Sequence, residues 1–124
     1  MERCFKLIDA IGAANVGFML DSWHWFTAEE TVEDITRLRA DQVAYVHVND
    51  APAGIPLAEQ LDNTRRLPGA TGVIDIAGFL GALKTIGYQG AVAAEPFDKS
   101  LRQMAPEDAV RATGEAMTKI FAMI

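Results

Sequence analysis

Asn15-Val-Gly-Phe-Met-Leu-Asp-Ser-Trp-His-Trp25 is the stretch that decides the fold of this 124-residue chain. Residues 16–20 are apolar, and a short apolar run bounded by turn residues predicts a strand that is buried on both faces. Asp21 ends the run, and His24 follows three residues later. The stretch therefore predicts a strand with an acid and an imidazole at its carboxyl end, two side chains able to bind a metal ion or to position a substrate.

The same arrangement recurs twice downstream. A second apolar strand is predicted at residues 43–48 and carries His47, and a third at residues 91–95 ends at Glu95. Helical periodicity separates the strands, and this alternation is typical of βαβ units with a parallel sheet. Because parallel strands deliver their carboxyl ends to one rim, these side chains and Asp21 are expected at a common site.

Four helices are expected around the strands. A capping box at Thr27 predicts the start of the second helix, Gly12 and Gly87 stop the first and third, and Pro106 opens the last. The expected ranges are residues 2–13, 28–38, 76–86 and 106–122.

The segment at residues 50–73 is rich in Pro and Gly and forms a long loop after the second strand. Loops of this length in compact domains are usually functional or disordered, and its place at a strand's carboxyl end favours function. It has room for one short helix near residues 57–63, and a fourth strand could lie within residues 70–74.

The composition is that of a globular protein, with half of the residues hydrophobic and a net charge of −6. No apolar run approaches the roughly 18 residues of a membrane-spanning helix, and the N-terminus does not resemble a signal peptide. Cys4 is the only cysteine, so no internal disulfide can form and a cytoplasmic location is expected. The acidic balance disfavours nucleic-acid binding, which needs clustered Lys and Arg.

Each candidate ligand also has an ordinary structural explanation. Asp21 could simply cap the end of its strand, and His47 could be a core histidine satisfied by the backbone. Glu95 is harder to explain in this way, because an acid that closes an apolar strand is costly to bury unless it binds something. The third strand therefore carries the strongest functional signal.

In this order, the motifs resemble the xylose isomerase-like superfamily of sugar isomerases and epimerases. They are Asp-x-x-His from Asp21, His-x-x-Asp from His47, Arg-x-x-Pro-Gly-x-x-Gly-x-Ile-Asp from Arg65, and Glu-Pro-Phe from Glu95. The family fold is a (β/α)8 TIM barrel of about 250 residues. The resemblance implies that residues 1–124 form a single partial domain of α/β class. This domain would be a parallel (β/α) half-barrel of three or four strands, equivalent to the C-terminal half of the barrel.

The resemblance also implies the roles of the site residues. Asp21, His47 and Glu95 would bind one divalent metal ion, Mn²⁺, Mg²⁺, Co²⁺ or Zn²⁺, and Glu95 would double as the catalytic acid and base. His24 and Arg65 would contact substrate oxygens.

Two of these assignments involve a choice between neighbours. Arg65 is preferred to Arg66 because it stands three residues before Pro68, as in the family motif. Trp25 is expected in the apolar wall of the sugar site, although Trp23 and Trp25 could both be ordinary packing.

The implied activity is isomerisation or epimerisation of a small sugar, polyol or hydroxy-keto acid. Moving a proton next to a carbonyl needs a Lewis acid that stabilises the enediolate and a carboxylate that carries the proton. The family places a further ligand glutamate on the preceding barrel strand, and this chain has no counterpart. A second interpretation is therefore a non-catalytic remnant or binding domain. A third, an endonuclease of DNA repair, is disfavoured by the acidic composition.

A half-barrel leaves two strand edges and the barrel-interior face without partners. We therefore expect a homodimer or a separate N-terminal half-barrel as partner. The residues alone leave the substrate, the metal and whether Met1 is the natural start undecided.

Overall fold

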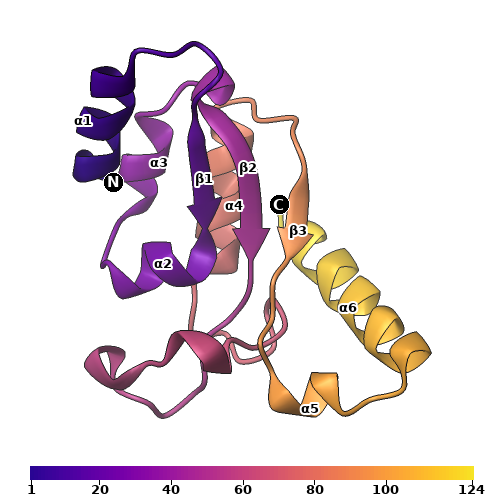
Figure 1. The fold of residues 1–124 in the computed structure, drawn as a ribbon. Coiled ribbons are helices and arrows are strands. Elements are labelled where there is room, and N and C mark those ends of the chain that lie inside the picture. The colour runs from indigo at the N-terminus through magenta and orange to yellow at the C-terminus, as the bar shows by residue number, and fades with distance from the viewer.

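The computed structural model describes residues 1–124 and contains one parallel sheet of order β1-β2-β3. The strands are Phe18–Asp21 (β1), Val43–Val48 (β2) and Val92–Ala94 (β3). All three run in the same direction, so their carboxyl ends meet at one rim (Figure 1). The α/β class and the parallel half-barrel predicted from the sequence are thereby confirmed, with three strands.

Six helices accompany the sheet. They are α1 (Glu2–Ile11), α2 (Ser22–Thr27), α3 (Val32–Thr36), α4 (Ile76–Thr85), α5 (Lys99–Arg102) and α6 (Pro106–Phe121). Short 3₁₀ turns lie at Ala40–Gln42, Leu57–Glu59 and Asp62–Thr64. No helix of the structure has both the length and the apolar character that crossing a bilayer requires.

The region after β1 differs from the sequence prediction. The carboxylate of Asp21 caps α2 directly at the end of the strand, and Thr27 lies in the last turn of that helix. The capping box predicted at Thr27 is wrong, because the box forms at Thr31, whose backbone N–H donates to Asp34 at 2.9 Å. Glu29 adopts a positive φ of 53° and separates the two helices, so the helix predicted from residue 28 begins four residues later.

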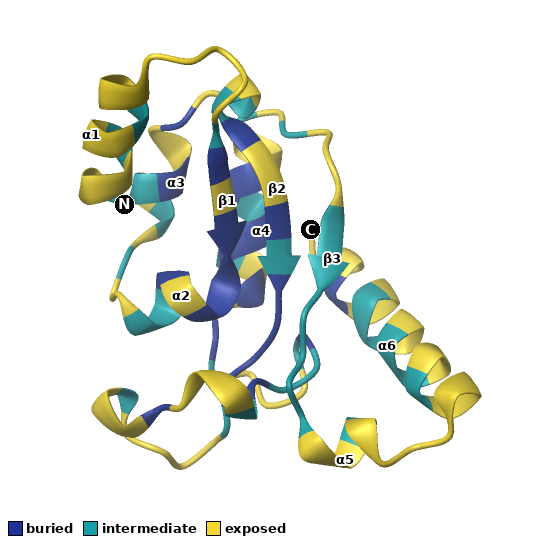
Figure 2. Cartoon of the chain, in the orientation of Figure 1, coloured by how far each residue is buried: buried dark blue, intermediate teal, exposed yellow.

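The hydrophobic core lies between the sheet and the helices behind it. Alternate residues of β2, Val46 and Val48, are fully buried together with Ile35 of α3 and Phe79 of α4. Figure 2 shows the buried residues concentrated on β1, β2 and the facing side of α4.

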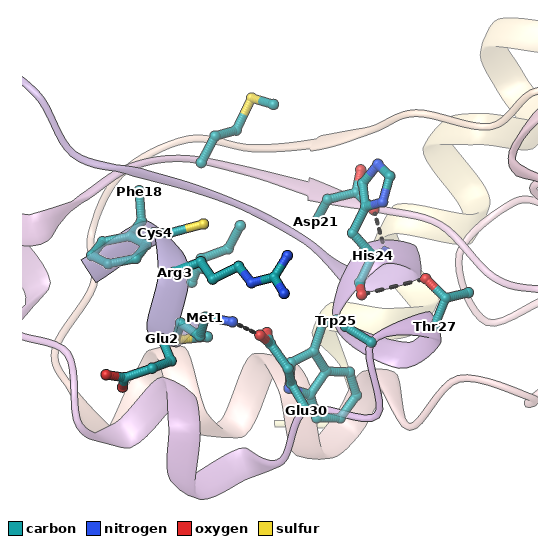
Figure 3. Close-up of a pocket in the computed structure, with 13 residues that line it drawn as sticks. Met1, Glu2, Arg3, Cys4, Phe18, Asp21, His24, Trp25, Thr27 and Glu30 are labelled. Carbon is teal, nitrogen blue, oxygen red and sulfur yellow. Dashed lines mark hydrogen bonds and ion pairs between the residues drawn. The ribbon is translucent and has the colours of Figure 1, made fainter. Parts of the chain in front are cut away.

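The opposite face of the sheet has no helix over it. Met19 is 62% exposed and Tyr45 is 37% exposed, and the two residues are paired in the β1–β2 register. A groove of about 700 Å³ also runs along the open edge of β1, between α1 and α2 (Figure 3). In a closed barrel the uncovered face of the sheet would line the interior.

The loop between β2 and α4 is folded around Asp50. Its fully buried carboxylate accepts hydrogen bonds of 2.8–3.0 Å from four backbone N–H groups, those of Ala51, Thr71, Gly72 and Ile74. Because a carboxylate takes these donors, the fourth strand considered at residues 70–74 does not form. Asp50 therefore stabilises the loop that carries Arg65, and it is not one of the three candidate metal ligands, Asp21, His47 and Glu95.

Candidate metal centre

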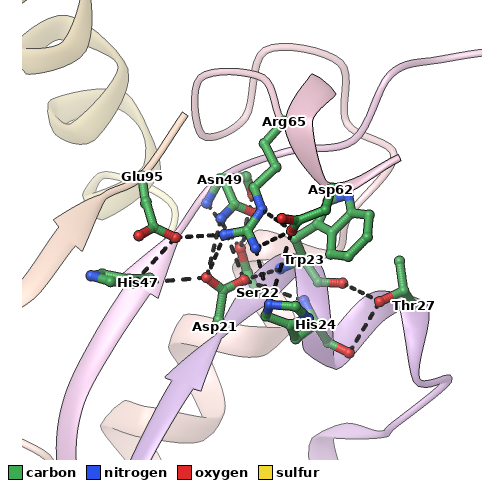
Figure 4. Close-up of polar contacts among 10 residues, drawn as sticks. All are labelled: Asp21, Ser22, Trp23, His24, Thr27, His47, Asn49, Asp62, Arg65 and Glu95. Carbon is green, nitrogen blue, oxygen red and sulfur yellow. Dashed lines mark hydrogen bonds and ion pairs between the residues drawn. The ribbon is translucent and has the colours of Figure 1, made fainter. Parts of the chain in front are cut away.

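Asp21, His47 and Glu95 meet at the carboxyl rim of the sheet, as the strand order predicts. Asp21 ends β1, His47 lies opposite it in β2, and Glu95 directly follows β3. One ligand atom from each residue can be chosen so that all three lie within 4.8 Å of one another. Figure 4 shows the three side chains directed toward a common point.

The two oxygens of Asp21 have different roles. Oδ1 accepts hydrogen bonds from the backbone N–H groups of Trp23, at 2.8 Å, and His24, at 3.2 Å. These bonds cap α2 and fix the carboxylate plane. Oδ2 is thereby turned toward the cluster. Asp21 can therefore cap the helix and also bind a metal ion, because each role uses a different oxygen.

His47 contributes a nitrogen that has no partner within the chain. Nδ1 is buried and makes no hydrogen bond, although it lies 3.4 Å from Glu95 Oε2 and 3.8 Å from Asp21 Oδ2. Buried polar atoms in proteins are nearly always satisfied, so an orphaned imidazole nitrogen between two carboxylates needs an explanation. A divalent cation fits this donor set, since imidazole and carboxylate are common ligands of such ions.

Glu95 is held by its backbone while its side chain stays accessible. Its N–H donates to the carbonyl of Val48 at 3.0 Å, which continues the pairing of β3 with β2. Oε2 faces Arg65 and His47, whereas Oε1 takes part in neither contact, and the side chain is 33% exposed. One carboxylate oxygen is therefore directed to the cluster, while the other stays outside these contacts.

Arg65 is buried in the middle of the cluster, with only 3% of its surface exposed. Nη1 donates to Asp21 Oδ2 at 2.9 Å and to Glu95 Oε2 at 2.5 Å, while Nε and Nη2 donate to Asp62. The rings of Trp23 and Phe97 lie 5.2 and 4.9 Å from its guanidinium carbon. Cation–π contacts of this kind fix the guanidinium in place.

The neighbouring arginine points elsewhere. Arg66 lies outside the cluster and pairs with Asp98 at 2.7 Å. Burial opposes ionisation of Asp98, but hydrogen bonds from Ser100 and the Arg66 guanidinium outweigh it and lower the Asp98 pKa. Of the two arginines weighed in the sequence, Arg65 is the one that the structure brings to the ligands.

His24 joins the cluster, whereas Trp25 does not. His24 Nε2 lies 3.0 Å from Arg65 Nη2, and because a guanidinium can only donate, a hydrogen bond between them requires His24 Nε2 as the acceptor. Trp25 donates through Nε1 to the carbonyl of Thr31 and packs edge-on against Phe79, with one side on the groove beside β1. Trp23 is the tryptophan that touches the site.

Two further residues, not singled out from the sequence, support the ligands. Ser22 Oγ donates to the carbonyl of Asn49 and accepts from its N–H, both at 2.9 Å, and both residues are fully buried. Asn49 Nδ2 lies 3.4 Å from Asp21 Oδ1. The two hydrogen bonds between Ser22 and Asn49, called the Ser22–Asn49 clamp below, join the residues that follow β1 and β2 at their carboxyl ends. The only signal for it in the sequence was a pair of small polar residues directly after two buried strands.

The chain is similar in sequence to known proteins. The family model for xylose isomerase-like TIM barrels matches residues 1–120. The inosose isomerase of Bacillus subtilis (strain 168) is 27% identical over 126 residues, which cover 98% of this chain and 45% of that protein. The D-psicose 3-epimerase of Enterocloster bolteae is 33% identical over 96 residues, which cover 77% of this chain and 28% of that protein.

A solved structure shows the same fold. The crystal structure of the IOLI protein with a zinc atom bound superposes with a TM-score of 0.88 and 24% identity, over 97% of this chain and 42% of that one. The chain thus spans less than half the length of these relatives.

Proposed function

Because the chain belongs to the xylose isomerase-like TIM barrel family, we propose that it holds one divalent metal ion and takes part in the isomerisation or epimerisation of a small sugar or polyol. The observation that carries the proposal is the buried, partnerless Nδ1 of His47 between the carboxylates of Asp21 and Glu95. The activities in the names of the relatives, inosose isomerase and D-psicose 3-epimerase, support the reaction class.

The donor set narrows the choice of metal. Two carboxylates and one imidazole suit hard or borderline ions, so Mn²⁺, Mg²⁺, Co²⁺ and Zn²⁺ are the candidates. A bound ion would supply positive charge beside the substrate carbonyl. The remaining chemistry falls to the chain's own residues.

Glu95 is the proposed acid and base. Oε1 makes no contact with Arg65 or His47, and the side chain is one-third exposed, so it can reach a proton on a bound substrate. Proton transfer by a positioned carboxylate is the step that an isomerase or epimerase needs next to a carbonyl. In an isomerisation, Glu95 would take the proton from one carbon and return it to the neighbouring carbon on the same face, whereas an epimerisation would need a second acid on the opposite face of the carbon.

Arg65 and His24 are the proposed contacts to substrate oxygens. Arg65 is fixed by Asp62 and two aromatic rings, and His24 beside it is exposed at the rim. Fixed donors orient a substrate before the proton moves. A substrate role for Trp25 stays a prediction, because its indole turns toward Phe79.

The test has two steps. Metal-stripped protein is titrated with Mn²⁺ and Zn²⁺ by calorimetry, and a stoichiometry near one ion per chain is expected. The loaded protein is then incubated with inosose or D-psicose in D₂O, and deuterium uptake at the carbon next to the carbonyl is followed by NMR. Absence of metal binding would overturn the proposal, whereas binding without deuterium uptake would favour a binding domain.

We also propose that the uncovered sheet face packs against a second copy of this chain. The exposed pair Met19 and Tyr45 and the groove along β1 are the surfaces such a copy would cover. Open strand edges and exposed apolar faces are rarely left without a partner. Light scattering of the purified chain is the direct measurement, and a stable monomer at micromolar concentration would contradict the proposal.

A further inference from the structure

We propose that Arg65 competes with the metal ion for the carboxylates of Asp21 and Glu95. Asp62 would hold the Arg65 guanidinium when a metal ion displaces it from these carboxylates. Arg65 would neutralise the ligand carboxylates of the metal-free chain. This inference rests on the proposed metal site, and it adds that Arg65 and Asp62 control the affinity of the site for the metal ion.

The first step in the argument is that Arg65 and a metal need the same atoms. Arg65 Nη1 donates to Asp21 Oδ2 and Glu95 Oε2. These are also the carboxylate oxygens that lie nearest to His47 Nδ1, at 3.8 and 3.4 Å. A metal bound by all three residues would therefore draw on the two oxygens that Arg65 now occupies.

The second step concerns charge. Asp21 and Glu95 carry two negative charges, and the guanidinium cancels one of them inside a site where Arg65 itself is 3% exposed. An arginine keeps its charge at all ordinary pH values, and like charges repel strongly where water is excluded. A doubly charged ion must therefore bind against Arg65 or displace it from the carboxylates.

The third step is the presence of a second anchor for the same guanidinium. Asp62 accepts from Nε and Nη2 of Arg65, on the part of the guanidinium that does not touch the ligands. Asp62 lies in the 3₁₀ turn Asp62–Thr64, and its side chain is 55% exposed. Arg65 is thus shared between an acid outside the ligand set and two acids inside it, so Asp62 would act on the metal site through Arg65.

The experiment is a calorimetric Mn²⁺ titration of metal-stripped protein in three forms. Arg65→Met removes the charge and keeps a long side chain between Trp23 and Phe97. Its Mn²⁺ affinity is expected to rise by roughly tenfold or more as the repulsion is lost. Asp62→Asn leaves Arg65 with only the ligand carboxylates as charged partners, so its Mn²⁺ affinity is expected to fall.

A double variant separates action through Arg65 from a direct effect of the Asp62 charge. In the Arg65→Met background, Asp62→Asn is expected to leave Mn²⁺ affinity unchanged, because the group it acts through is gone. A fall of the same size in both backgrounds would overturn the role of Asp62. The pair Arg66 and Asp98 supplies matched controls, since Arg66→Met and Asp98→Asn break a similar ion pair outside the cluster.

The outcomes distinguish this inference from the proposed function. If the parent chain binds Mn²⁺ and Arg65→Met binds it equally or more weakly, the inference fails while the metal site stands. If neither binds, both fail. Should Arg65→Met not fold, Arg65→Gln and the thermal shift of each variant on adding Mn²⁺ give the same comparison, because a ligand that binds only the folded state raises its stability.

Discussion

Asp21 and His47 are direct partners in the parallel register of β1 and β2, and this pairing places an acid and an imidazole side by side at the sheet rim. Side chains alternate between the two faces of a strand, so a slip of one residue would turn His47 into the helix-covered core. The register also places Ala93 opposite His47, which leaves Glu95 two residues further along the chain, directly after β3 and on the same face. The candidate centre is thus a product of strand register.

Replacing Glu95 tests the ligand set. Glu95→Gln keeps the shape of the side chain but removes the charge, and we expect Mn²⁺ affinity to fall by at least about tenfold, since an uncharged amide is a poorer ligand for a hard cation. Calorimetric titration of metal-stripped protein measures the change. Glu107→Gln serves as the control, because it removes the charge of an acid in the first turn of α6 that is not one of the three candidate ligands. Equal affinity of Glu95→Gln and the parent chain would refute the assignment.

The clamp between Ser22 and Asn49 predicts a stability effect. Ser22→Ala leaves the buried N–H of Asn49 without its acceptor, and a buried unsatisfied group of this kind costs about 1–3 kcal/mol of unfolding free energy. Urea denaturation followed by circular dichroism measures the loss. Thr85→Ala removes an exposed hydroxyl that donates within α4 and is expected to change stability by less than about 0.5 kcal/mol. Similar effects of the two substitutions would show that the clamp contributes little.

The parts of the fold that were predicted correctly rest on patterns that are local in the sequence. The apolar run at residues 43–48 coincides with β2, and the spacing that puts an acid or imidazole at each strand end brought Asp21, His47 and Glu95 into one cluster. Periodicity could not reveal α2, because six residues are too few and the helix is started by the Asp21 cap.

The parts that were missed depend on contacts between distant residues. Ser22 meets Asn49 across 27 positions, and Arg65 meets Asp21 across 44. The sequence also did not reveal the direction of α2, which places Trp23 against Arg65 and Trp25 against Phe79. Such relationships follow from tertiary packing, which no local pattern in one sequence encodes.

The ion pair of Asp98 and Arg66 predicts a pH dependence of stability. The Asp98 pKa is lowered in the folded chain from its usual 3.8, because hydrogen bonds from Ser100 and Arg66 outweigh the opposing effect of burial. A carboxyl group with a lowered folded pKa stabilises the fold above its unfolded pKa and loses that contribution as pH falls through the folded pKa. Asp98→Asn is therefore expected to lower the urea midpoint near pH 7 and to have a shrinking effect below about pH 4. A difference that is constant with pH would contradict the assignment.

The uncovered face of the sheet predicts self-association that one substitution can disrupt. Met19 is 62% exposed on this face, in the edge strand β1, so a second copy packed there would bury it beside Tyr45. Met19→Glu would place a charge in that interface, and an unpaired buried charge is strongly unfavourable. We expect the parent chain to scatter light as a dimer and Met19→Glu as a monomer. Val110→Glu, at an exposed apolar position on α6, is the control and is expected to stay dimeric. A dimer that survives Met19→Glu would place the interface elsewhere, because no dimer built on this sheet face could tolerate the charge.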